Sequence, residues 1–184
     1  MPEPRTETAT SASNATVAHW RQRAKSEPLE ALRALETSND LSVGLTHWIQ
    51  GIALFELSDT RAAIGRFDAA LAVPTGRWRP HVRISRYAAV AAIGDVAGEA
   101  AEGLAELSQH ADSVVAAMAR SQLGFVQLRQ GELHSAEELL RSAVDALRDV
   151  PDFQDALARV LGNLGSCLLF LERRVESIPF HRGL

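Results

Sequence analysis

The residue types that could carry out catalysis are present in this chain, but their spacing does not assemble a recognisable catalytic or metal site. A nucleophilic cysteine needs a lowered pKa and a nearby histidine. Cys167 lies on a largely apolar stretch, two residues after Gly165, so we interpret it as a buried, inert side chain. No two histidines have metal-ligand spacing. The histidines are His19, His47, His81, His110, His134 and His181. We therefore expect neither a metal nor a cofactor.

Two pairs of acidic residues have the side chains that general acid–base catalysis uses. Glu137–Glu138 and Glu102/Glu106 fall opposite the apolar stripe of amphipathic segments, so we expect these carboxylates to be solvated. The glycine-rich phosphate and dinucleotide motifs and the serine elbow of hydrolases do not occur. The stretch 162–167 is rich in glycine, but we interpret Gly165 as a small residue where two packed helices cross, and not as part of a phosphate loop. We predict that the chain is not an enzyme.

A run of arginines between residues 77 and 86 is the most unusual polar feature. Its arginines surround Trp78, and such a cluster could contact phosphates and stack a base. The alternative is an arginine-rich turn in which Trp78 packs on neighbouring helices. We favour the turn, because the chain as a whole is acidic and no second basic cluster accompanies this one. Nucleic acid is therefore not the partner that we predict.

The chain contains an internal repeat, which should be sought before any secondary structure is assigned. Small and apolar residues follow Gly51 at fixed distances, and the same layout returns after Gly124. The first copy is defined by Gly51, Ala63, Phe67 and Ala70, and the second by Gly124, Gly131, Ala136 and Leu140. A third copy begins at Gly165 and fades toward Ser177, His181 and Leu184. A weaker copy starts at Ala88, so the four anchors are 37, 36 and 41 residues apart.

This layout resembles the tetratricopeptide repeat (TPR), a helix–turn–helix unit of about 34 residues. Two antiparallel helices approach closely only where no large side chain separates them, which explains the glycine or alanine at each crossing. A large apolar residue four positions after the alanine is expected to fill the space toward the next unit. The resemblance covers roughly residues 15–184. It implies an all-α fold, a right-handed α-α superhelix (a TPR solenoid) of about five helix pairs.

Helical periodicity and helix-breaking residues set the expected elements. Residues 1–14 are expected to form a disordered tail, followed by one TPR-like helical repeat domain over 15–184. Its units are expected at about 15–40, 41–76, 79–110, 112–150 and 152–184, the last incomplete. The expected helices are 15–25, 28–38, 42–57, 60–73, 80–93, 96–109, 112–130, 133–148, 153–171 and 174–184.

By resemblance, the first helix of each unit lines a concave groove that binds a peptide or a partner helix. The candidate groove residues are Trp48, Ile52, Phe55, Arg86, Gln122, Phe125, Arg129 and Asn163. We hypothesise that Trp48 and Phe55 anchor an apolar side chain, while Arg86 or Arg129 meets an acidic group. The alternative is that Trp48 and Phe55 only pack against the preceding helix pair. A chaperone-tail function is disfavoured, because Trp48 and Ile52 stand where that clamp has lysine and asparagine.

Composition limits the remaining function classes. The chain has 184 residues, a formal charge of −4 and 46% hydrophobic residues. No window of about 18 apolar residues predicts a membrane span, and no signal peptide is visible, so we expect a cytoplasmic protein. The predicted function is a non-catalytic scaffold for protein interactions. The alternative is a truncated or detached regulatory TPR module of a multidomain peptidase with a caspase-like CHAT domain, or of a transcription regulator. Self-association through an uncapped last repeat is a further expectation.

Overall fold

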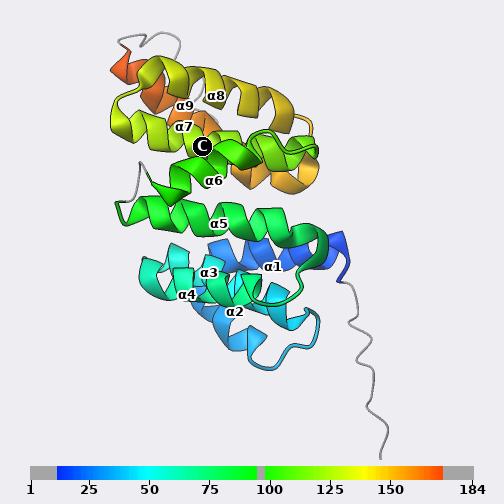
Figure 1. Ribbon diagram of the computed structural model, residues 1–184. Helices are drawn as coiled ribbons and strands as arrows, with labels where there is room; N and C mark the ends of the chain where they lie inside the picture. The colour runs from blue at the N-terminus through cyan, green and yellow to red at the C-terminus, as the bar shows by residue number, and fades with distance from the viewer. Residues whose placement is uncertain (1–11, 95–97, 172–184) are drawn as a thin grey trace, which may run out of the picture. The chain divides into compact units, whose positions relative to one another are not determined.

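The computed structural model describes residues 12–94 and 98–171, and every regular element in these two ranges is helical (Figure 1). The α-helices are α1 (Asn14–Ser26), α2 (Pro28–Leu35), α3 (Val43–Glu56), α4 (Thr60–Leu71), α5 (Arg79–Ala92), α6 (Glu99–Leu107), α7 (Ser113–Gln130), α8 (Leu133–Leu147) and α9 (Gln154–Phe170). Short 3-10 turns, η1 (Gly76–Trp78) and η2 (Pro151–Phe153), precede α5 and α9. Most of the expected tail and the helix expected at 174–184 lie outside the described residues.

The chain divides into two compact units, and the division falls inside α5, between Val82 and Arg83. In the first unit, α3 packs along α4, and both α1 and α2 pack on α3. The core of this unit contains Trp20, Ile49 and Phe67, all of them buried. The central helix α3 therefore has neighbours on several sides, which limits the surface that it can offer to a partner.

In the second unit, α7 packs along both α6 and α8, while α9 packs on α8 and also contacts α7. A continuous apolar core joins α8 to α9 and includes Leu140, Leu147, Leu164 and Leu168. Because short connections join α7 to α8 and α8 to α9, successive helices are antiparallel neighbours. The helices α7 and α9 consequently run in the same direction.

Glycine permits the closest helix crossing in two of the pairs. A Cβ atom on Gly51 would lie 2.6 Å from Cδ1 of Phe67, and one on Gly124 would lie 2.9 Å from Cγ of Leu140. Both distances are too short for real contacts between carbon atoms. The close packing of α3 on α4, and of α7 on α8, therefore depends on the absence of a side chain at these glycines. These are the two glycines that the repeat pattern predicts at helix crossings. The large residues differ from expectation: Phe67 and Leu140 fill the space beside the glycine of their own pair.

The α5–α6 pair reverses this arrangement. A Cβ atom on Gly103 of α6 would lie 2.6 Å from the hydroxyl oxygen of Tyr87 on α5. Here the large residue comes from the first helix and the small residue from the second. Ala88, the anchor expected for this unit, lies one position after the aromatic residue that makes the close contact. The two helices still approach closely, but the large side chain and the glycine have changed places between the first and the second helix of the pair.

Two helices end in the same left-handed turn at the same repeat position. Gly131 follows α7 with a φ of +83°, and Ser58, which lies seven residues after Gly51 as Gly131 does after Gly124, has a φ of +63°. In both turns a backbone N–H reaches back to close the helix end: Asp59 donates to Leu54 O at 2.9 Å, and Glu132 donates to Gln127 O at 3.0 Å. Serine adopts this conformation at a cost that glycine avoids.

Replacing Gly51 with alanine should destabilise the protein by about 1–3 kcal/mol, because the new methyl group overpacks the α3–α4 crossing. Gly65→Ala is the matched control. Gly65 lies in the exposed interior of α4, and a Cβ there meets nothing within 4 Å. We expect this control to stabilise the fold by about 0.5–1 kcal/mol through helix propensity. Urea unfolding measures the free energy of unfolding of both variants. Equal values for the two variants would contradict a close α3–α4 crossing at Gly51.

Ser58→Gly should stabilise the protein by about 1 kcal/mol, because it removes the strain of a left-handed residue bearing a Cβ. The reciprocal substitution, Gly131→Ser, should destabilise by a similar amount. Thermal unfolding followed by circular dichroism measures both changes. A stabilising Gly131→Ser variant would show that this turn does not need glycine.

Candidate functional site

The predicted groove residues of the first unit are mainly used in packing. Trp48 is only 1% exposed and Ile52 is also buried, while Phe55 is partly exposed. The Trp48 ring lies 5.7 Å from the ring of Trp78 and 6.1 Å from that of His81. Trp48 thus fastens α3 to the start of α5, and its indole presents almost no surface to a partner.

Arginines flank this aromatic cluster. The guanidinium of Arg21, from α1, lies 5.9 Å from the centroid of the Trp48 ring, and that of Arg77 lies 5.4 Å from the centroid of Trp78. Trp78 itself is partly exposed, and its ring is 5.1 Å from that of His81. The contact from α1 agrees with the alternative in which Trp48 packs against the preceding helix pair. These contacts are cation–π interactions that stabilise the unit.

The other arginines of the run 77–86 bind groups within the protein. Arg79 donates to the carbonyl oxygen of Leu71 at the end of α4, at 3.0 Å. Arg83 donates through both terminal nitrogens to the two carboxylate oxygens of Glu106, at 3.1 and 2.8 Å. Arg86 donates to Glu99 at 2.6 Å. Most of the arginine side chains that could bind a phosphate therefore bind groups of neighbouring helices instead.

Arg83 on α5 and Glu106 on α6 form an ion pair with a nitrogen–oxygen distance of 2.8 Å. The hydrogen bonds from Arg83 lower the pKa of the Glu106 carboxyl below its ordinary value. The same bonds raise the pKa of Arg83, against the opposing effect of its partial burial. Arg83 also donates to the hydroxyl of Tyr87 at 3.4 Å. This pair holds the side chain that fills the Gly103 crossing, so its role is structural.

The remaining catalytic candidates do not converge. Cys167 is buried, as predicted, and its Sγ donates to the carbonyl oxygen of Leu133 at 3.2 Å. Glu137 is only 9% exposed and accepts a hydrogen bond from Arg141 at 3.0 Å, so its expected solvation is wrong. The reason is that α7 and α9 both cover α8, which narrows its solvent face. Within residues 12–94 and 98–171, no group of three or more potential ligands gathers as a metal site would require.

The predicted groove residues of the second unit remain accessible. Gln122 and Phe125 on α7 and Asn163 on α9 are partly exposed. Arg129 is exposed, and one of its N–H groups donates to the carbonyl oxygen of Ala91 at 2.9 Å. Arg86, from α5, is partly exposed and paired with Glu99, as described above. We call the surface formed by Gln122, Phe125, Arg129 and Asn163 the inner face.

Sequence reasoning missed two exposed apolar side chains that continue the inner face. Ile93 is 56% exposed and Phe170 is 68% exposed. Both lie five residues after a repeat anchor, as Arg129 does. Extending the repeat register past the predicted groove positions would have found them.

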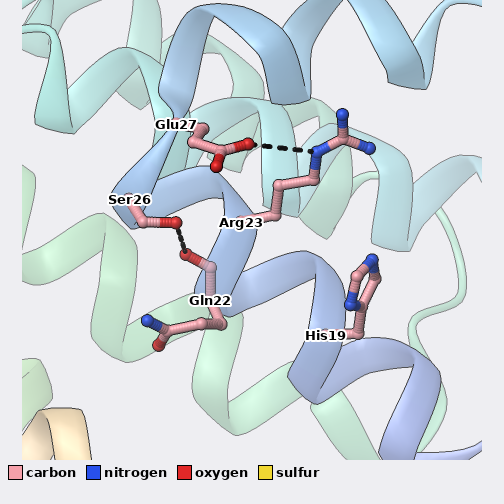
Figure 2. A pocket seen from close by; sticks show the side chains of 5 residues that line it. All are labelled: His19, Gln22, Arg23, Ser26 and Glu27. Atoms are coloured by element: carbon pink, nitrogen blue, oxygen red, sulfur yellow. Dashed lines mark hydrogen bonds and ion pairs between the residues drawn. The ribbon is translucent and has the colours of Figure 1, made fainter.

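A separate shallow hollow of about 290 Å³ lies along α1 (Figure 2). Its lining consists of His19, Gln22, Arg23, Ser26 and Glu27, which come from α1 and the residue that ends it. Arg23 pairs with Glu27 at 3.9 Å, and the Ser26 hydroxyl donates to the Gln22 carbonyl oxygen at 3.1 Å. The hollow is thus the surface of one helix, with no second element facing it among its lining residues.

None of the helices in the described part of the chain is both long enough and apolar enough to cross a membrane.

Comparisons with known proteins identify the fold. No protein-family model matches the chain, and no curated protein matches it. Solved structures of similar fold include two of the protein MamA. Residues 41-end of MamA from Desulfovibrio magneticus RS-1 give a TM-score of 0.54 at 20% identity, covering 91% of this chain and 92% of that one. The MamA RS-1 ArsTM double mutant gives 0.53 at 20% identity, with the same coverage. The fold class is the predicted one, an all-α, TPR-like α-α superhelix.

Replacing Arg83 with methionine should raise the pKa of Glu106 toward its ordinary value of about 4.5. Because the folded-state pKa is lowered, the pair stabilises the fold above the unfolded-state pKa, and this contribution is lost as the pH falls through the folded-state value. Carboxyl NMR titration measures the shift. The control is Arg148→Met, which removes the exposed partner of Asp145. A Glu106 pKa unchanged by Arg83→Met would refute the pairing.

Proposed function

We propose that the protein is a non-catalytic scaffold that binds a peptide or a partner protein along the first helices of its repeats. The observation that supports this most directly is the inner face of the second unit. Gln122 and Asn163 are partly exposed, and their side-chain amides make no hydrogen bond within the described residues. Each lies two residues before its repeat anchor, so the repeat presents the same chemistry on two successive first helices.

The first unit does not present an accessible polar side chain at the corresponding position of α3. Ile49, which also lies two residues before its anchor, is fully buried, and Trp48 beside it packs inside the unit. A partner would therefore engage α7 and α9, where polar and aromatic side chains are available together. An exposed arginine and partly exposed aromatic and amide groups are typical of protein-binding surfaces.

Other aspects of the proposal rest on the sequence. The same face would serve a stand-alone scaffold or a regulatory module of a longer CHAT-type peptidase or transcription regulator. The proposal also includes a cytoplasmic location and a partner that is a protein and not a nucleic acid. It further includes self-association through the last repeat.

Photo-crosslinking tests the location of the binding face. A benzophenone amino acid in place of Gln122 should form a covalent adduct with the native partner in an extract of the host cell. The matched control carries the same group in place of His134, which is exposed on α8. Adducts at position 122 and not at position 134 support the proposal. Equal adducts at both positions, or adducts at 134 alone, would place the partner elsewhere.

A further inference from the structure

The inner face ends in a row of three side chains at the same repeat position. Ile93, Arg129 and Phe170 each lie five residues after an anchor, in the order of the repeats. Two of them are large, exposed apolar residues, and the middle one is an exposed arginine. A cation between two apolar side chains is a specific pattern, whereas exposed apolar residues are otherwise scattered singly on most proteins. We call this row the rim.

Contacts within the second unit bring the members of the rim together. The hydrogen bond from Arg129 to Ala91 joins the end of α7 to the end of α5, two residues before Ile93. The contact of α7 with α9, which run in the same direction, places the carboxyl ends of these two helices, with Arg129 and Phe170, on the same side of the second unit. The rim therefore follows the carboxyl ends of α5, α7 and α9, with the cation in the middle.

The guanidinium of Arg129 is held in place but not saturated. One N–H group donates to Ala91 O, where a cation is also favoured by the carboxyl end of the helix. Arginine carries five N–H donors, so others remain for a carboxylate, which accepts such donors in pairs. The charge and geometry of the rim thus complement an acidic side chain flanked by apolar ones.

The amides of Gln122 and Asn163 indicate the backbone conformation of the partner. A side-chain amide offers both a donor and an acceptor, which matches the N–H and C=O groups of an extended chain. A helical partner satisfies its backbone groups internally, so its backbone would not bond to these two amides. Packed helices are about 8–10 Å apart, which an extended chain spans in about three residues.

We propose that the inner face and the rim bind an extended peptide carrying an acidic residue between two large apolar residues, each about three positions away. The acidic residue meets Arg129, and the apolar residues cover Ile93 and Phe170. This inference rests on the proposed function and specifies its partner.

Selection from a random peptide display library on the full chain tests the proposal without assuming a sequence. The expected binders share an acidic residue flanked by large apolar residues. Binding of a fluorescein-labelled peptide synthesised from the selected sequence is then measured by fluorescence polarisation. A version N-methylated along its backbone should bind at least tenfold more weakly. A version locked as a helix by a side-chain bridge should also bind at least tenfold more weakly.

Matched variants locate the peptide. Arg129→Glu should lower affinity at least tenfold and should restore binding to a peptide in which lysine replaces the acidic residue. The control Arg33→Glu changes an exposed, paired arginine of α2 and should have no effect. Phe170→Ala should lower affinity about tenfold, whereas Leu29→Ala, at another exposed apolar residue, should not. The charge exchange separates a lost contact from a loss of folding.

The outcomes distinguish this inference from the proposed function. Binders that are basic, that require a helix, or that ignore the Arg129 and Phe170 variants overturn the partner assigned here and leave a peptide-binding scaffold intact. Failure to select any binder, together with no adduct at position 122, contradicts both.

Discussion

The close crossing of paired helices at a glycine is the constraint on which the rest of the structure depends. Where Gly51 meets Phe67 and Gly124 meets Leu140, one missing side chain allows two helices to approach until a large residue fills the gap. The tight crossing fixes which side of each helix is buried. Helix periodicity then determines which side of each helix faces solvent. Because the repeat spacing is similar, the solvent-facing positions recur from one unit to the next.

That transfer links packing to function. In the second unit, the buried sides of α7 and α9 are used against α8, so Gln122, Phe125 and Asn163 remain partly accessible at corresponding positions. In the first unit α3 is surrounded more completely, and the corresponding positions hold apolar residues that are buried. The same repeat positions therefore serve stability in one unit and, in the function that we propose, offer a binding surface in the other.

Much of the fold follows from the sequence, because alanine-rich amphipathic segments and helix-breaking residues are local signals. The expected helices between residues 15 and 171 agree with α1–α9 to within a few residues at each end, and the glycine crossings follow from their spacing. The contacts that the sequence does not reveal are those between segments. The burial of Trp48 depends on Trp78 and His81, that of Glu137 on two covering helices, and the reversed Tyr87–Gly103 contact on a pair with no glycine at its anchor. The candidate site was predictable where it follows the repeat register, and Phe170 was missed because the register was not carried to the end of α9.

The most direct test of the central claim is a map of backbone amide chemical shifts during titration with the selected acidic–apolar peptide. The account predicts that the shifts cluster at Ile93, just after α5, and at Gln122, Arg129, Asn163 and Phe170, on the carboxyl-terminal halves of α7 and α9. Shifts that cluster instead around Trp48 and Trp78, or along α8, would contradict the claim that the repeat register positions the binding surface.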